Sequence, residues 1–157
     1  MTAWDCPASP AYDLRPATDA DFDFARDLYL SSMKPLLIAL DAWDADQIDA
    51  AFRGYFIAAE IRVVTVAGVD AGWIQVSQTH KELCLDQLHL IEEVRGQGIG
   101  TALIKAVIAD ATGQNKNVSL SLVRGNPAIT LYRRLGFERT SEDDTKIHKR
   151  LTTGRAA

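Results

Sequence analysis

A run of glycines in the second half of the chain has the spacing of a phosphate-binding turn. Arg95 to Leu103 reads Arg-Gly-Gln-Gly-Ile-Gly-Thr-Ala-Leu, between an apolar strand-like run and an apolar helix-like run. The first N–H groups of a helix have no partner within the helix and carry a partial positive charge. Because Gly96, Gly98 and Gly100 leave this backbone uncovered, the segment indicates a site for a phosphate-bearing ligand.

The spacing of these glycines excludes two common phosphate-binding motifs. Thr101 follows Gly100 directly, whereas a P-loop has a lysine between its last glycine and the Ser or Thr. A dinucleotide-binding turn needs Gly-x-Gly-x-x-Gly early in a βαβ unit, and this chain has Gly-x-Gly-x-Gly beyond its midpoint. The pattern that remains, Arg-x-x-Gly-x-Gly from Arg95 to Gly100, resembles the acyl-CoA loop of the GNAT superfamily of N-acetyltransferases.

A second segment resembles the same superfamily. Asn126 to Phe137 reads Asn-Pro-Ala-Ile-Thr-Leu-Tyr-Arg-Arg-Leu-Gly-Phe, which is similar to the later-helix pattern Asn-x-x-Ala-x-x-Leu-Tyr-x-x-x-Gly-Phe. Local chemistry also predicts a helix here: Asn126 can cap it, Pro127 fits its first position, and Gly136 fits the left-handed position after its last turn. Two motifs in this order extend the resemblance to about residues 12–151.

Length and composition fit one domain with one core, since 47% of the 157 residues are hydrophobic. No apolar run is long enough to span a membrane, and the first 12 residues lack the regions of a signal peptide, so we expect a cytoplasmic protein. Cys6 and Cys84 are too few and too far apart to indicate a disulfide framework or a zinc site, and we expect no metal. The net charge of −4 argues against non-specific nucleic-acid binding.

Hydrophobic periodicity predicts helices that alternate with strands. Expected strands cover residues 13–16, 61–67, 73–77, 83–91, 118–123, 137–140 and 145–151, with a hairpin turn around Gly68–Gly72. Expected helices begin at Thr18, at Asp44 or Asp46, near Ile99 and at Asn126, and Pro35 should end or kink the first of them. The resemblance implies a GNAT-like α/β (α+β) fold, in which about four helices flank a mixed, mostly antiparallel sheet of about six to seven strands.

The resemblance implies acetyl-CoA as a cosubstrate. In the superfamily, the strand before the glycine turn separates from its neighbour, and the freed backbone binds the pantetheine arm. The resemblance therefore implies that His89, Leu90 and Ile91 bind the pantetheine arm. The pyrophosphate would lie on the backbone amides of the turn. The predicted cofactor-binding residues there are Arg95, Gly96, Gln97, Gly98, Ile99, Gly100 and Thr101, and Asn126 is added as a helix cap that also touches the cofactor.

The resemblance also makes Tyr132 the predicted catalytic residue. Acetyl transfer to a primary amine by direct attack on a thioester releases a thiolate, which must be stabilised or protonated. A phenol with a pKa of about 10 can donate to a thiolate whose conjugate acid has a pKa near 8.5. Judged by its helical spacing alone, Tyr132 would be a core aromatic beside Leu131 and Leu135.

The general base stays open at this point. The position where many superfamily members carry a glutamate is Cys84 here, and a buried thiol is usually inert. Asp86, two residues after Cys84, shares its strand parity, and Glu82 lies on the other side of Cys84 along the sequence. His89 lies closer to the cofactor, and we expect its pKa to be near neutrality. A water chain could also carry the proton. Some group must take this proton, because deprotonating a lysine-like ammonium at pH 7 costs about 4.6 kcal/mol.

The acceptor is expected to be a small-molecule or peptide primary amine, polar or cationic. Residues 1–90 hold six basic and 14 acidic side chains, whereas residues 91–150 hold ten basic and seven acidic ones. An acidic and aromatic wall could attract and stack on a cationic amine. Its expected members are Asp41, Trp43, Asp44, Asp46 and Tyr55.

Two other functions remain compatible with the sequence. One is a non-catalytic acyl-CoA-binding or regulatory module on the same fold. The other is an unrelated phosphate-binding enzyme whose glycines match by chance. Because superfamily members often form dimers, a homodimer is also compatible with the resemblance, although no segment indicates an interface.

Overall fold

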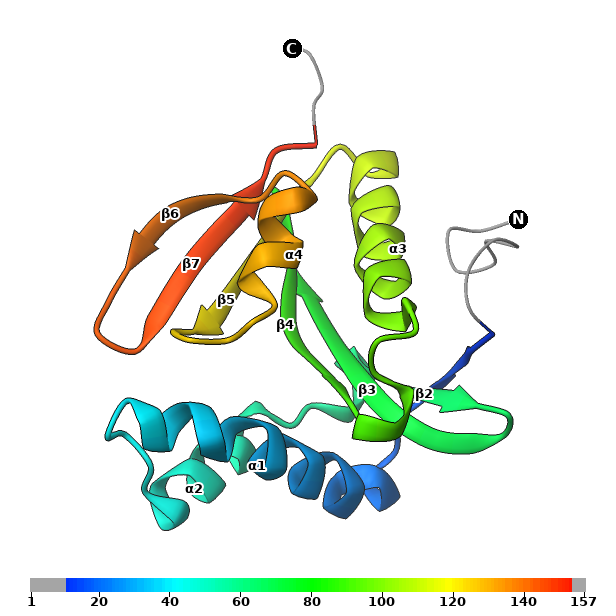
Figure 1. Cartoon of the computed structure of the whole chain (residues 1–157). Helices are drawn as coiled ribbons and strands as arrows, with labels where there is room; N and C mark the ends of the chain where they lie inside the picture. The colour runs from blue at the N-terminus through cyan, green and yellow to red at the C-terminus, as the bar shows by residue number, and fades with distance from the viewer. Residues whose placement is uncertain (1–10, 154–157) are drawn as a thin grey trace.

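A computed structural model describes residues 11–153, which form a seven-stranded sheet with helices on both faces (Figure 1). The strands are β1 (Asp13–Pro16), β2 (Ile61–Val66), β3 (Val69–Gln78), β4 (Glu82–Leu90), β5 (Asn117–Val123), β6 (Glu138–Glu142) and β7 (Lys146–Leu151). The helices are α1 (Phe22–Ala39), α2 (Ala45–Tyr55), α3 (Ile99–Gly113) and α4 (Ile129–Arg134). Single 3₁₀ turns cover Asp19–Asp21, Ala58–Glu60 and Glu92–Val94.

The strand order is β1-β2-β3-β4-β5-β7-β6, and every neighbouring pair is antiparallel except β4 and β5. This arrangement confirms the predicted mixed, mostly antiparallel sheet with four α-helices. Among the described residues, no helix combines the length and the apolar character that crossing a membrane requires.

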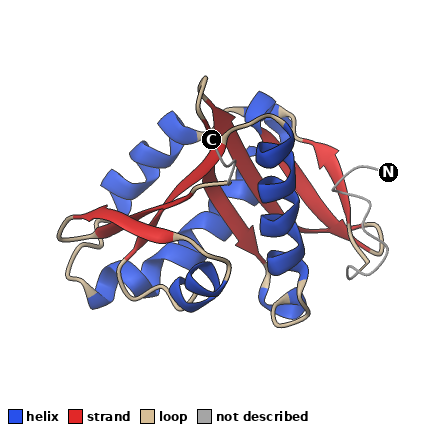
Figure 2. Ribbon diagram, turned by 90° about the horizontal axis from the view of Figure 1, so that it is seen from above, coloured by secondary structure: helices blue, strands red, loops and turns tan. Residues whose placement is uncertain are grey.

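Two apolar clusters attach the helices to opposite faces of the sheet (Figure 2). On one face, Leu103 of α3 is fully buried in a cluster with Leu85 and Leu120 of the central strands. On the other face, the ring of Phe52 in α2 meets the ring of Trp73 in β3 edge to face, with centroids 5.9 Å apart. Burial of these side chains supplies the main favourable free energy of folding and fixes the helices relative to β4 and β5.

The hairpin between β2 and β3 is tighter than predicted. Its turn is Ala67–Gly68, with φ angles of 53° and 80°, and β3 already begins at Val69. The expected turn over Gly68–Gly72 was therefore wrong in extent. Gly72 lies inside β3 opposite Leu90, where an added Cβ would be 2.4 Å from the carbonyl oxygen of His89. This glycine permits a close approach of two strands.

Helix boundaries follow the predicted capping residues with local differences. Thr18 accepts from the N–H of Ala20, but the segment it caps is the 3₁₀ turn that leads into α1. The prediction that Pro35 could end the first helix was wrong, because α1 continues to Ala39. Of the two proposed starts for α2, Asp44 is the cap, since its carboxylate accepts from the N–H of Gln47 at 3.1 Å.

The two central strands separate halfway along their length. Residues 82–85 of β4 pair with residues 117–120 of β5, and the pairing stops there. Beyond that point β4 pairs only with β3, and β5 only with β7. Asp86 is the extra residue of a bulge at this position, because Val76 lies opposite Leu85 while Gln75 lies opposite Gln87. The inner edges of both strands are thus left without a neighbouring strand.

Candidate active site

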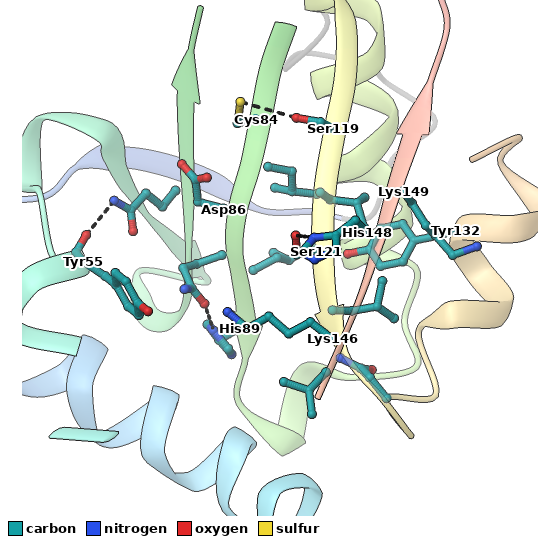
Figure 3. A pocket seen from close by; sticks show the side chains of 18 of the residues that line it. Tyr55, Cys84, Asp86, His89, Ser119, Ser121, Tyr132, Lys146, His148 and Lys149 are labelled. Atoms are coloured by element: carbon teal, nitrogen blue, oxygen red, sulfur yellow. Dashed lines mark hydrogen bonds between the residues drawn. The ribbon is translucent and has the colours of Figure 1, made fainter. Parts of the chain in front are cut away.

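A cavity of about 670 Å³ lies where β4 and β5 separate (Figure 3). Its walls come from both central strands, from β3, β6 and β7, and from all α-helices except α3. Three predicted site residues line it, namely His89, Asn126 and Tyr132. The remaining predicted residues, Leu90, Ile91 and those from Arg95 to Thr101, lie at the end of β4 and in the turn that follows, outside the lining of this cavity.

The glycine turn has the backbone that a phosphate ligand requires. Gly96 and Gly98 have φ angles of 75° and 85°, in the left-handed region where a side chain causes strain. Gly98 is the N-cap of α3, and its carbonyl accepts from the N–H of Ala102 at 3.0 Å. The four N–H groups from Gly98 to Thr101 precede this first helical bond and are available to an anion. Since a Cβ on Gly96 would meet nothing within 4 Å, the turn is open to its surroundings.

Two side chains of the turn bind its own backbone. The Nε of Arg95 donates to the carbonyl oxygen of Leu90 at 2.9 Å, and the Nε2 of Gln97 donates to the carbonyl oxygen of Glu93 at 3.1 Å. The N–H of Ile91 donates to the carbonyl oxygen of Ala71 at 2.8 Å. Two of the backbone groups expected to hold a pantetheine arm thus already have protein partners, and Arg95 would have to move to free the Leu90 carbonyl.

Tyr132 extends from α4 toward the cavity (Figure 3). Its side chain is buried, and its ring meets the ring of Phe137 edge to face with centroids 5.5 Å apart. Burial raises the pKa of the phenol to about 12, so the hydroxyl stays protonated at neutral pH and can donate a hydrogen bond. Gly136, with a φ of 99°, ends the helix as predicted.

Asn126 is the predicted cap, but the helix after it starts late. Its Oδ1 accepts from the N–H of Ala128 at 2.9 Å, whereas α4 begins at Ile129. The prediction that Pro127 occupies the first helical position was therefore wrong. Asn126 is also one residue closer to Tyr132 than in the superfamily pattern.

Two of the candidate bases have other roles in this structure. Glu82 accepts from the Nε of Arg150 at 2.7 Å and does not line the cavity. His89 is buried, with its ring centroid 5.1 Å from that of Trp73 and 5.5 Å from that of Tyr29. Burial, and secondarily the charge of Arg95, lowers the pKa of His89 to about 4. The expectation of a near-neutral pKa was wrong, since aromatic rings replace the water that would stabilise an imidazolium.

Asp86 is the carboxylate among the candidate bases that lines the cavity. It lies at the bulge where the strands separate, and its side chain lines the cavity. Loss of part of its surrounding water raises the pKa of this carboxyl, and the charge of Glu60 raises it further, while hydrogen bonds from Ser77 act in the opposite direction. A carboxylate with a raised pKa is a stronger base than an ordinary one. Cys84, two residues earlier, instead lies 3.4 Å from the hydroxyl of Ser119.

The acceptor wall differs from the prediction. Of its five expected members only Tyr55 lines the cavity. Trp43 lies under the ammonium of Lys34 at 5.7 Å, and Asp44 caps α2. The acidic side chains that do line the cavity are Glu60 and Asp86. Gln75 positions the first of them, because its Nε2 donates to Glu60 at 3.0 Å and to the carbonyl of Tyr55 at 2.9 Å.

Sequence reasoning missed the contribution of β5 and β7. Ser121 lines the cavity, and its Oγ lies 2.6 Å from the Nδ1 of His148 on the neighbouring strand. The other ring nitrogen of His148 is 3.7 Å from the carboxylate of Asp143. Lys146 lines the same wall. The signal was the polar alternation along β5 and the polar residues of β7, but both patterns are equally typical of a face in contact with water. Within residues 11–153, no group of three or more His, Cys, Asp or Glu side chains could hold a metal ion.

One protein-family model matches the segment of the chain that contains both motifs. The family described as the acetyltransferase (GNAT) domain matches residues 53–139, which include the glycine turn and α4. The chain belongs to the GNAT acetyltransferase superfamily. A curated relative of this GNAT domain is N-acetyltransferase family 8 member 2 of Rattus norvegicus, which is 39% identical over 74 residues. The matched segment is 45% of this chain and 32% of the rat protein, so the chain spans about a third of that relative.

Solved structures share the GNAT fold at low sequence identity. The PaiA N-acetyltransferase of Thermoplasma acidophilum, solved in complex with coenzyme A, has a TM-score of 0.68 and 16% identity, covering 91% of this chain and 99% of that one. Ard1 of Thermoplasma volcanium has a TM-score of 0.64 and 22% identity, with 90% and 97% coverage. The ribosomal-protein-S18-alanine N-acetyltransferase of Escherichia coli has a TM-score of 0.66 and 17% identity, with 94% and 97% coverage. At these identities the likeness establishes the fold alone.

Proposed function

We propose that this protein is an N-acetyltransferase that moves an acetyl group from acetyl-CoA to a primary amine of a small molecule or peptide. The observation that carries the proposal is that one cavity, opening where β4 and β5 separate, is lined by both a carboxylate of raised pKa, Asp86, and a buried phenol, Tyr132. The first can accept a proton from an amine and the second can donate to a departing sulfur.

The residues of the glycine turn fit the cosubstrate. Backbone N–H groups from Gly98 to Thr101 would hold the pyrophosphate, and the unpaired inner edge of β4 from Asp86 to Leu90 would hold the pantetheine arm. Acetyl-CoA supplies a thioester carbonyl that a neutral amine nitrogen attacks while the CoA thiol departs. Arg95 and Asn126 serve mainly to shape the turn and the start of α4, as their bonds to backbone groups indicate.

Asp86 takes the amine proton in this proposal. An ammonium cannot attack a carbonyl, so the acceptor must lose a proton within the site. Asp86 faces the cavity, and its raised pKa narrows the difference between the proton affinities of the carboxylate and the amine. The proton passes to it directly or through one water.

Tyr132 stabilises the leaving sulfur by a hydrogen bond. Its pKa of about 12 lies above that of a free thiol, about 8.5, so complete transfer of the phenol proton would be unfavourable. A protonated donor held beside the sulfur still stabilises the negative charge that develops there. Solvent can then protonate the thiolate when CoA leaves.

The test is a panel of primary amines assayed with acetyl-CoA, with thiol release and the mass of the acetylated product as readouts. We expect at least one class of amine to be acetylated. Tyr132→Phe should lower kcat while leaving the affinity for CoA unchanged. Binding of CoA without acetylation of any amine in the panel would overturn the proposal and favour a non-catalytic CoA-binding module.

A further inference from the structure

Opposite walls of the cavity carry opposite charges. The wall formed by β4 and the turn before β2 contributes the carboxylates of Asp86 and Glu60. The wall formed by β7 contributes basic side chains, of which Lys146, Lys149 and Arg150 all line the cavity. A ligand in this space is therefore exposed to a dipolar field.

The basic side chains differ in whether their charge is already neutralised. Arg150 forms an ion pair with Glu82 at 2.7 Å. Lys149 is buried opposite Leu120, on the sheet face that α3 and α4 cover, and burial lowers the pKa of its ammonium. Lys146 is exposed, and within residues 11–153 no carboxylate lies within ion-pair distance of its ammonium. It is thus the cation of this wall that is free to bind a ligand.

The backbone of Lys146 is fixed although its side chain is exposed. Its N–H donates to the Oδ1 of Asp143 at 2.7 Å, in the turn that joins β6 to β7. From this anchored position the side chain extends across the cavity toward β4 (Figure 3). His148, on the same side of β7, is held by Ser121 at 2.6 Å and adds positive charge to this wall only when it is protonated.

The acidic wall suits the amine end of an acceptor. Glu60 is held in place by Gln75, and Asp86 has no cationic side chain as a partner among the described residues. An acceptor carrying only positive charge would satisfy these carboxylates but would be repelled by Lys146. An acceptor that also carries a negative charge would satisfy both walls.

We infer that the acceptor is an amine that carries an anionic group, such as a carboxylate, and that Lys146 binds this group while the amine lies beside Asp86. The inference rests on the proposed function and adds a substrate class to it. It also replaces the expectation of a polar or cationic acceptor, because the four Asp and Trp side chains expected to form the acidic wall do not line the cavity.

The test compares matched acceptors. An α-amino acid, its amide and the corresponding amine without the carboxyl group are each assayed with acetyl-CoA, by release of thiol and by product mass. We expect kcat/KM for the amino acid to exceed that for the amide about tenfold, which is the size of one partly solvated charge interaction. Lys146→Gln should remove this preference by lowering kcat/KM for the amino acid about tenfold, with little change for the amide and no change in the KM for acetyl-CoA.

Two further variants sharpen the result. Lys81→Gln removes the same charge from an exposed turn outside the cavity, and it should leave the preference unchanged. Lys146→Glu should reverse the preference, in favour of the amide or the simple amine.

Equal use of the amino acid and the amide by the unmodified protein would overturn the inference and leave the acetyltransferase proposal standing. An equal loss with both acceptors, or a raised KM for acetyl-CoA, in Lys146→Gln would show that this lysine serves the cosubstrate and would also overturn it. Absence of turnover with every amine would instead refute the proposed function.

Discussion

Glu82 at the start of β4 and Asp86 at its middle are carboxylates of the same parity, yet the structure uses them differently. Glu82 lies in the half of β4 that pairs with β5, opposite Asn117, and it forms an ion pair with Arg150. Asp86 lies where β5 has separated, on a bulge that faces the cavity. The residue type is similar, but one carboxylate is neutralised by an arginine of β7, across β5, and the other is left available. The comparison teaches that the position where β5 leaves β4 decides which carboxylate can do chemistry.

The largest effect is expected for Asp86→Asn. It removes the proposed base without changing the shape of the side chain, and we expect kcat/KM to fall by about 100-fold or more, the typical contribution of a general base. The wild-type activity should rise with pH through the pKa of Asp86, above its ordinary value of 3.8, and the variant should lose this acid limb.

Stability separates this role from a structural one. Because the folded-state pKa of Asp86 is raised, its contribution to stability is full at low pH and is lost as pH rises through that pKa. Asp86→Asn should therefore unfold at the same or a higher temperature at pH 7. A lower melting temperature together with a small loss of activity would indicate that Asp86 supports the bulge and is no base.

Tyr132→Phe should have the second largest effect. We expect kcat to fall by about 10- to 100-fold, because one hydrogen bond to the developing thiolate is lost. The ring packing against Phe137 is kept, so the affinity for CoA measured by calorimetry should not change. Unchanged kcat would remove Tyr132 from the reaction and leave it as a core aromatic.

Gly98→Val should weaken CoA binding by about tenfold or more. The φ angle of 85° at this position is unfavourable for a β-branched residue, so the first turn of α3 would shift away from the geometry that holds phosphate. Gly113→Ala, at the other end of α3, is the control, since a Cβ there would meet nothing within 4 Å. An unaltered Kd for CoA in a folded Gly98→Val protein would contradict the placement of the pyrophosphate.

Glu82→Gln should have the smallest effect. Its ion pair with Arg150 is partly exposed, and such pairs contribute about 0–1 kcal/mol to the free energy of unfolding. Activity should stay within about twofold of the wild type, because no substrate contact is removed. A loss comparable to that of Asp86→Asn would contradict the distinction between these two carboxylates of β4.

Features set by local backbone chemistry could be predicted from the sequence. The spacing of a phosphate-binding turn identified Gly98, and the left-handed position after a helix identified Gly136; both have positive φ angles. The capping role of Asn126 is local in the same sense. Such positions depend on a few neighbouring residues, so spacing alone is enough to find them.

Features that depend on which strands meet could not be predicted. Asp86 and Lys146 are 60 residues apart, and nothing in their own surroundings indicates that they line one cavity. The low pKa of His89 arises from burial among rings of other elements, including Trp73, which a strand pattern does not reveal. Gly72 resembled a turn residue because close contact between strands and tight turning favour the same amino acid.

The most direct test of the account is a crystal structure of the protein with coenzyme A. We predict that the pyrophosphate lies on the N–H groups from Gly98 to Thr101, that the pantetheine arm follows the inner edge of β4 beyond Leu85, and that the sulfur lies within hydrogen-bonding distance of the Tyr132 hydroxyl and faces Asp86. A coenzyme bound elsewhere, or a sulfur outside the cavity between β4 and β5, would contradict the account.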